Sequence, residues 1–115
     1  MLMEISSYTK NNTAYITLIG QLWQKEDINA LEEEVTRSLE QEKMQIVIDL
    51  QRLSFINSLG LGALVRMHST IHDTGNRLVL FCIPSNVLEV LEISGFEAFM
   101  TIARSEQELD SILAL

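Results

Sequence analysis

Two short apolar runs, each followed by a stretch with helical periodicity, constrain the fold of this chain most strongly. Residues 46–50 and 78–83 are nearly continuous in apolar side chains and rich in β-branched ones. Such runs are typical of strands covered on both faces, as in a parallel sheet. Strands that alternate with helices are joined by right-handed crossovers. The pattern therefore predicts an α/β fold with a largely parallel sheet.

The opening residues predict a hairpin that adds one antiparallel edge. Residues 2–7 and 14–19 resemble short strands, and a polar turn cluster lies between them at residues 10–12. We expect Gly20 to end the second strand and a loop to follow. A helix is then predicted from Ile28, with Asp27 as its N-cap and three glutamates early in the helix as a solvated face.

The second half of the chain predicts three further helices. One extends over residues 58–73 after a loop at residues 51–57, one opens at residues 84–85 and ends at Gly95, and one follows a capping box that starts at Ser105. A last short strand is expected within residues 99–103. The predicted order is ββαβαβα(β)α: a mixed, mostly parallel sheet of four to five strands, packed by about four helices, in one domain over residues 1–115.

Charge and composition narrow the classes of partner. The chain has 8 basic and 16 acidic residues, a net charge of −8, which argues against binding to nucleic acid or to an anionic membrane. The longest apolar run falls far short of the ~20 residues that a membrane span needs, and no signal peptide is apparent. Cys82 is the only cysteine, so no internal disulfide can form, and we interpret it as a core thiol. We expect a cytoplasmic protein.

The sequence patterns of enzymes and metal sites are incomplete in this chain. His68 and His72 are four residues apart, but Ser69 stands where HExxH needs glutamate, so we expect two structural histidines. Gly60 and Gly62 open a helix without completing a nucleotide-binding fingerprint, which leaves nucleotide binding a weak hypothesis. No base follows the region of Ser58 to complete a hydrolase triad. We therefore expect no catalytic residue, no cofactor, no metal and no enzyme activity.

Ser58 is the remaining residue of interest. A serine just before a helix most often serves as its N-cap. Leu59, Ala63 and Met67 recur every four residues, on a different face from the apolar residues predicted to pack on the sheet. This second apolar face is either an exposed docking stripe beside Ser58 or a contact with a neighbouring helix.

The strongest resemblance to a known family lies in residues 49–64, which read DLQRLSFINSLGLGAL. This stretch resembles the signature of STAS domains, the anti-sigma-factor antagonists of bacteria. Residues 20–22, 75–78 and 93–96 resemble three shorter motifs of the same family, so the resemblance covers essentially the whole chain in order. Asn57 stands where the family usually has aspartate, and Leu59 where serine or threonine is common. Trp23 takes the place of the acidic residue that often follows the family motif matched by residues 20–22.

The resemblance implies a partner-switching role. In that scheme the unphosphorylated antagonist binds an anti-sigma factor that is also a serine kinase of the histidine-kinase-like ATPase type. The kinase phosphorylates the serine that matches Ser58, the complex dissociates, and a PP2C-type phosphatase resets the cycle. The residues expected to contact the partner are Asn57, Leu59, Gly60, Ala63 and Met67. Two alternatives stay open: a non-switching STAS scaffold or accessory subunit of a stress-sensing or lipid-transport complex, and a switch with an output other than a sigma factor.

Overall fold

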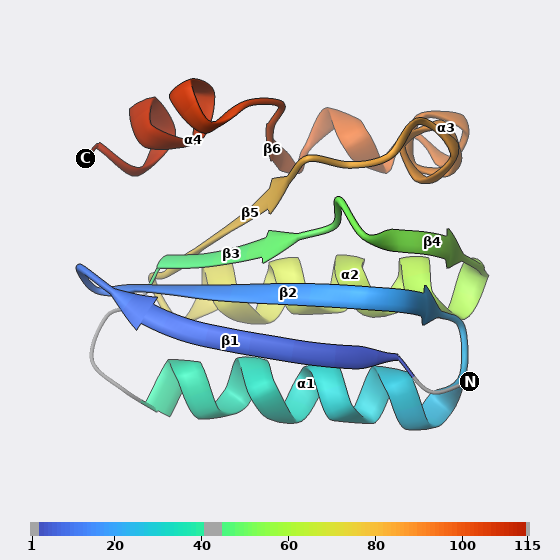
Figure 1. Ribbon diagram of the computed structural model, residues 1–115, viewed down its shortest axis with the longest axis horizontal. Coiled ribbons are helices and arrows are strands. Elements are labelled where there is room, and N and C mark those ends of the chain that lie inside the picture. The colour runs from blue at the N-terminus through green and yellow to red at the C-terminus, as the bar shows by residue number, and fades with distance from the viewer. Residues whose placement is uncertain (1–2, 41–44, 115) are drawn as a thin grey trace.

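The computed structural model describes residues 3–40 and 45–114, which form a mixed sheet packed by helices (Figure 1). In chain order the elements are β1 (Glu4–Lys10), β2 (Thr13–Leu22), α1 (Lys25–Glu40), β3 (Gln45–Asp49), β4 (Leu53–Ile56), α2 (Ser58–Asp73), β5 (Arg77–Phe81), α3 (Ser85–Ser94), the 3-10 helix η1 (Phe96–Ala98), β6 (Thr101–Ala103) and α4 (Glu106–Leu113). The predicted α/β class is confirmed.

The sheet has the strand order β1-β2-β3-β5-β6, and β4 pairs with the far end of β2. Only the β1–β2 pairing is antiparallel among the described strand pairs. Asn11 and Asn12 join these two strands with φ values of 52° and 60°, as the tightest hairpin turn requires. The predicted hairpin and its antiparallel edge are therefore confirmed.

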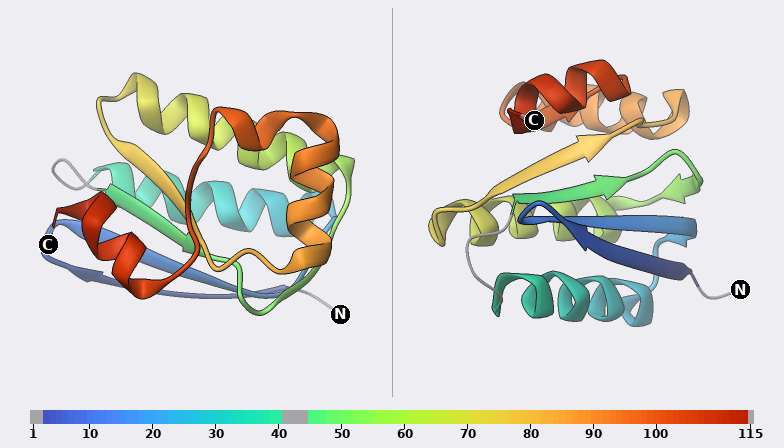
Figure 2. Two further views of the ribbon diagram at one scale, coloured as in Figure 1. Left: turned by 90° about the horizontal axis from the view of Figure 1, so that it is seen from above. Right: turned by 60° about the vertical axis from the view of Figure 1, so that its left-hand side comes forward.

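The two faces of the sheet bury different sets of side chains. Apolar residues of β2, β3 and β5 that point to one face pack with α1, α2 and α3 in the larger core. On the other face, Val47, Val79 and Ala103 pack against Leu109 and Leu113 of α4. Figure 2 (right) shows α1 and α4 on opposite sides of the strands. One sheet face is thus covered along its length, whereas the other is covered only where α4 lies.

The region around β2 and α1 differs from the prediction. Gly20 does not end β2, because the strand continues to Leu22 after a register shift against β4 between Gly20 and Gln21. Helix α1 begins at Lys25, so Asp27 lies in its first turn and is not the N-cap. The buried Asp27 carboxylate instead accepts a hydrogen bond from the amide of Met3, at 3.2 Å. Apolar periodicity predicts the start of this helix too late, because its first turn is polar.

Strand β4 was not predicted, and it raises the sheet to six described strands rather than four or five. It lies within residues 51–57, where the sequence pattern predicts a loop. Its side chains do not alternate between buried and exposed: Leu53 and Ile56 are buried, whereas Ser54 and Phe55 are exposed. Strand β5 ends at Phe81, so Cys82 follows it in a left-handed conformation and is half-buried rather than part of the core.

Candidate functional site

The junction between β4 and α2 consists of one residue, Asn57, and it determines how Ser58 is presented. The Asn57 Oδ1 accepts a hydrogen bond from the amide of Gly60 at 3.0 Å, and its Nδ2 donates to the carbonyl of Trp23 at 3.1 Å. Asn57 is therefore the N-cap of α2, and the predicted cap role of Ser58 is wrong. Ser58 is the first helical residue, and it is exposed.

Gly60 holds the start of α2 against the end of β2. A Cβ atom at this position would lie 2.2 Å from the carbonyl oxygen of Leu22 and 2.8 Å from a side-chain carbon of Ile56. Only glycine allows the helix to approach the strand so closely. At Gly62, by contrast, a Cβ would meet only the flexible end of Arg66, at 3.4 Å. Close backbone packing therefore requires glycine at position 60 and not at position 62.

Three large apolar side chains are exposed at this end of the molecule. They are Trp23 after β2, Phe55 on β4 and Leu59 beside Ser58, exposed by 37%, 44% and 59% respectively. The bond from Asn57 to the Trp23 carbonyl ties the end of β2 to the start of α2. We call Trp23, Phe55, Asn57, Ser58 and Leu59 the Ser58 surface. Sequence reasoning missed Phe55 as a surface residue, since only the presence of β4 indicates which way its side chain points.

Of the two interpretations left open for the second apolar face of α2, contact with a neighbouring helix holds for Ala63 and Met67, and only Leu59 is exposed. Ala63 and Met67 are buried, and α1 packs alongside α2 next to Met67. Met67 lies with Val35 and Leu39 of α1 in a narrow hollow between the two helices. Gly60 is also buried, under Leu22. Of the five residues expected to contact a partner, only Asn57 and Leu59 reach the surface, so the candidate site contracts to the N-terminus of α2.

The electrostatics of this helix end favour an anion. The first turn of α2 contains no acidic residue. The amides of a helix's first turn have no acceptor within the helix, and the helix dipole places partial positive charge there. Asn57 satisfies the amide of Gly60, and the amides of Ser58 and Leu59 belong to the same first turn. A phosphate on Ser58 would therefore meet a favourable backbone environment.

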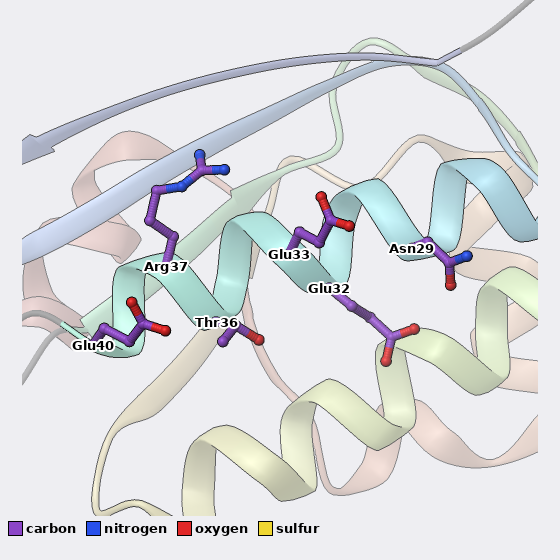
Figure 3. A pocket seen from close by; sticks show the side chains of 6 residues that line it. All are labelled: Asn29, Glu32, Glu33, Thr36, Arg37 and Glu40. Carbon is purple, nitrogen blue, oxygen red and sulfur yellow. The ribbon is translucent and has the colours of Figure 1, made fainter.

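A hollow of about 540 Å³ on the outer side of α1 does not form a comparable site (Figure 3). Its lining includes Glu32, Glu33 and Arg37, whose side chains do not converge: Glu32 points toward α2 and Arg37 toward the opposite side of the helix. Glu32 lies 4.0 Å from Arg66, and Arg37 pairs with Glu34. The glutamate run lies in the middle of α1 rather than early in it, and Glu33 is exposed.

The two histidines lie on α2 with ring centroids 6.3 Å apart, and His68 is also near Phe99 at 6.4 Å. Within residues 3–40 and 45–114, no three His, Cys, Asp or Glu side chains gather closely enough to bind a metal ion. None of the helices in those ranges combines the length and the apolar character that spanning a bilayer would require.

Residues 4–109 match the family model of the STAS domain. The chain belongs to the STAS domain family. The chain is also 32% identical over 77 residues to BtrV of Bordetella bronchiseptica, which is described as an anti-sigma factor antagonist. That match spans 67% of this chain and 66% of BtrV, slightly less than two thirds of the relative's length. The family resemblance read from residues 49–64 is thus confirmed.

Solved STAS structures share the fold over nearly the whole chain. A Thermotoga maritima protein assigned as an anti-sigma factor antagonist superposes with a TM-score of 0.85 at 16% identity, covering 96% of this chain and 95% of its own. SpoIIAA in its unphosphorylated form gives 0.77 at 21% identity, covering 98% and 97%. Phosphorylated SpoIIAA of Bacillus gives 0.69 at the same identity, covering 96% and 98%. This STAS fold is therefore the one found in anti-sigma factor antagonists.

Proposed function

We propose that this STAS protein is an anti-sigma factor antagonist that works by partner switching, with Ser58 as the phosphorylated residue. Its unphosphorylated form binds a serine kinase of the histidine-kinase-like ATPase type that also acts as the anti-sigma factor. Phosphorylation of Ser58 releases that partner, and a PP2C-type phosphatase removes the phosphate.

The observation that carries this proposal is the exposed Ser58 at the first position of α2. Asn57 takes over the capping bond, so the Ser58 hydroxyl does not have to serve as the cap. The exposed Leu59 lies beside it and offers an apolar contact to a partner. SpoIIAA, which has this fold, has been solved both with and without its phosphate.

The physics of a phosphate at Ser58 suits a switch that leaves the fold intact. A phosphoserine carries about −1.5 to −2 charges at neutral pH. The N-terminus of α2 accommodates negative charge, so the helix itself is not disrupted. A partner that packs on Leu59 must, however, desolvate or repel that charge. A loss of about 3 kcal/mol in binding free energy would already weaken the complex more than a hundredfold.

Intact-mass analysis tests the proposal directly. The protein is incubated with ATP and the candidate serine kinase from the same organism, and we expect the mass to increase by one phosphate. Ser58→Ala is expected to abolish the increase. Ser85→Ala is a matched control, because Ser85 is an exposed serine at the first position of α3, and this variant should be phosphorylated like the wild type. Phosphate on Ser58→Ala would refute Ser58 as the site.

Binding measurements separate switching from a permanent complex. Ser58→Asp is expected to lose the kinase while its circular dichroism spectrum stays that of the wild type. A complex that forms equally well with the wild type and with Ser58→Asp would instead favour a non-switching STAS subunit, in which the Ser58 surface is a constant interface.

A further inference from the structure

A groove of about 560 Å³ lies on the sheet face that α4 covers only in part. Its floor is formed by one face of β2, β3 and β5, where Thr17, Asp49 and Phe81 are register neighbours. One wall is α4, and the other is the β1–β2 hairpin. The groove is distinct from the Ser58 surface, because it lies on the opposite sheet face from α2 and near the other end of β2.

Aromatic rings form a large part of the groove. Tyr8 and Tyr15 are cross-strand neighbours whose rings stack, with centroids 4.8 Å apart and planes inclined by 12°. Phe81 lies in the floor beside Asp49. Tyr8 lies on the edge strand β1, and its large aromatic side chain is 60% exposed. Aromatic faces attract cations, most strongly where the site is partly shielded from water.

Carboxylates complete the groove. Asp49 reaches it from β3, and Glu106 and Asp110 reach it from successive turns of α4. Lys10 is the cation that lines the same groove. In the part of the chain that the structure describes, none of the three carboxylates forms an ion pair. Asp49 accepts one local bond, from the amide of Gln51 at 2.9 Å. Charged side chains in the groove therefore leave an excess of negative charge.

Two groups near these carboxylates have raised pKa values, mainly through burial. Burial raises the pKa of Tyr15 above its ordinary value, and the nearby Tyr8 and Asp110 raise that pKa further. Burial likewise raises the pKa of Cys82, as do Asp49 and Glu106. Both groups resist becoming anions, first because they are partly buried and then because carboxylates lie near them.

The wall formed by α4 is held in place at both ends. Ser105 caps its N-terminus by accepting the amide of Glu108 at 3.1 Å. At the other end, Arg77 donates to the carbonyl of Ile112 at 2.7 Å, and Gln45 donates to that of Leu113 at 3.4 Å. Glu106 and Asp110 are thus presented from a fixed helix, so the groove is formed before any ligand binds.

From the stacked tyrosines, the three carboxylates and the size of the groove, we propose that it binds a small organic cation, an amine with an apolar portion. Its volume falls in the range of small-molecule sites, roughly 300–1,000 Å³. The ammonium group lies on the acidic side of the groove, which Asp49, Glu106 and Asp110 line, and the apolar portion packs on the tyrosine rings and Phe81. Nucleotides and fatty acids, which are anions, are repelled by the same three carboxylates.

Fluorine NMR of protein labelled with fluorotyrosine tests this proposal, because both tyrosines of the chain line the groove. Phenethylamine is the probe, with phenethyl alcohol and hydrocinnamate as neutral and anionic probes of similar shape. We expect phenethylamine to shift the tyrosine signals in a saturable manner. The alcohol should bind about fivefold more weakly, as expected for loss of an exposed ion pair, and hydrocinnamate should not bind.

Variants assign the binding to the groove. Asp110→Asn combined with Glu106→Gln should weaken phenethylamine binding by about fivefold or more. Glu33→Gln removes an exposed carboxylate from α1, on the other side of the sheet, and should bind as the wild type does. The absence of a saturable shift, equal binding of all three probes, or equal loss in Glu33→Gln would overturn the proposal. Binding of a lysine-rich peptide without binding of phenethylamine would also overturn it and assign the groove to a protein partner.

Discussion

Among the glycines of the chain, Gly60 leaves the least room for a side chain. Its α-carbon faces the carbonyl of Leu22 so closely that any side chain would overlap it. The sequence shows two glycines in this turn, and only their surroundings distinguish them.

We expect Gly60→Ala to lower the free energy of unfolding by about 1–3 kcal/mol, because the added methyl must displace backbone. Gly62→Ala is the matched control, two residues along the same helix. It should leave stability unchanged or raise it by up to about 1 kcal/mol, since alanine is the better helix former and meets only a flexible side chain. Urea denaturation measures both. Equal effects of the two substitutions would contradict the packing role of Gly60.

The pKa of the Cys82 thiol responds to burial and to two carboxylates that line the groove. Burial, Asp49 and Glu106 raise its pKa, so less thiolate is present at any pH below that value. We expect iodoacetamide to alkylate Cys82 more slowly than a free thiol at mildly alkaline pH. Asp49→Asn should speed the reaction, because it removes negative charge while an asparagine oxygen can still accept the Gln51 amide. A rate that is the same in Asp49→Asn as in the wild type would argue against this electrostatic effect.

At the scale of elements, β4 and α2 act as one unit that presents the Ser58 surface. Strand β4 pairs with β2, and Asn86 of α3 donates to the carbonyl of Ser54 on β4 at 3.0 Å. Asn57 then turns the chain into α2 and caps it. The backbone on both sides of Ser58 is therefore held by contacts with β2 and α3 and by the Asn57 cap, although the serine side chain is exposed.

A negative charge at the start of α2 should not disturb this unit. We expect Ser58→Asp to leave the free energy of unfolding unchanged or to raise it by up to about 1 kcal/mol, because the charge complements the helix dipole. His72→Asp places the same charge in the last turn of α2, at an exposed position, and should lower stability by a similar amount. Thermal denaturation compares them. A marked loss of stability in Ser58→Asp would mean that phosphorylation acts on the fold and not only on the interface.

At the scale of the whole molecule, acidic side chains outnumber basic ones by two to one. The net charge is −8, and the described residues contain two ion pairs, Arg37–Glu34 and Arg66–Glu32. Mutual repulsion of the carboxylates therefore opposes folding.

We expect added sodium chloride to raise the midpoint of thermal unfolding, because salt screens this repulsion. Glu33 is exposed, and Glu33→Lys changes the net charge from −8 to about −6. This variant should have a higher midpoint at low salt, and its midpoint should depend less on salt. Differential scanning calorimetry at several ionic strengths measures the effect. A midpoint that is independent of salt would show that the repulsion is unimportant.

Several features of the fold could be predicted because they depend on neighbours along the chain. Helix α2 has the predicted bounds, Asn11 and Asn12 form the predicted turn, and Gly95 and Ser105 cap the predicted helix ends. Turn and cap preferences are local properties of the backbone, and apolar periodicity extends over several turns of a helix.

Strand β4, the burial of Met67 and the cap of α2 could not be predicted from those signals. Leu53–Ile56 is four residues long and becomes a strand only because the extended end of β2 supplies its hydrogen bonds. Met67 is covered because α1, far away in sequence, packs on that side of α2. Asn57 is favoured over Ser58 as the cap once its second hydrogen bond, to the carbonyl of Trp23, is available.

The amino-acid sequence is enough to predict the fold class, the order of most elements, the STAS family and Ser58 as the residue of interest, since each rests on local pattern or on residue identity. Which neighbours of Ser58 are exposed becomes visible only in the folded molecule. The same is true of the groove that the tyrosines of the hairpin, Asp49 and the acidic face of α4 line together. Exposure and the meeting of distant side chains depend on how elements pack, and packing is set by contacts between residues far apart in the chain.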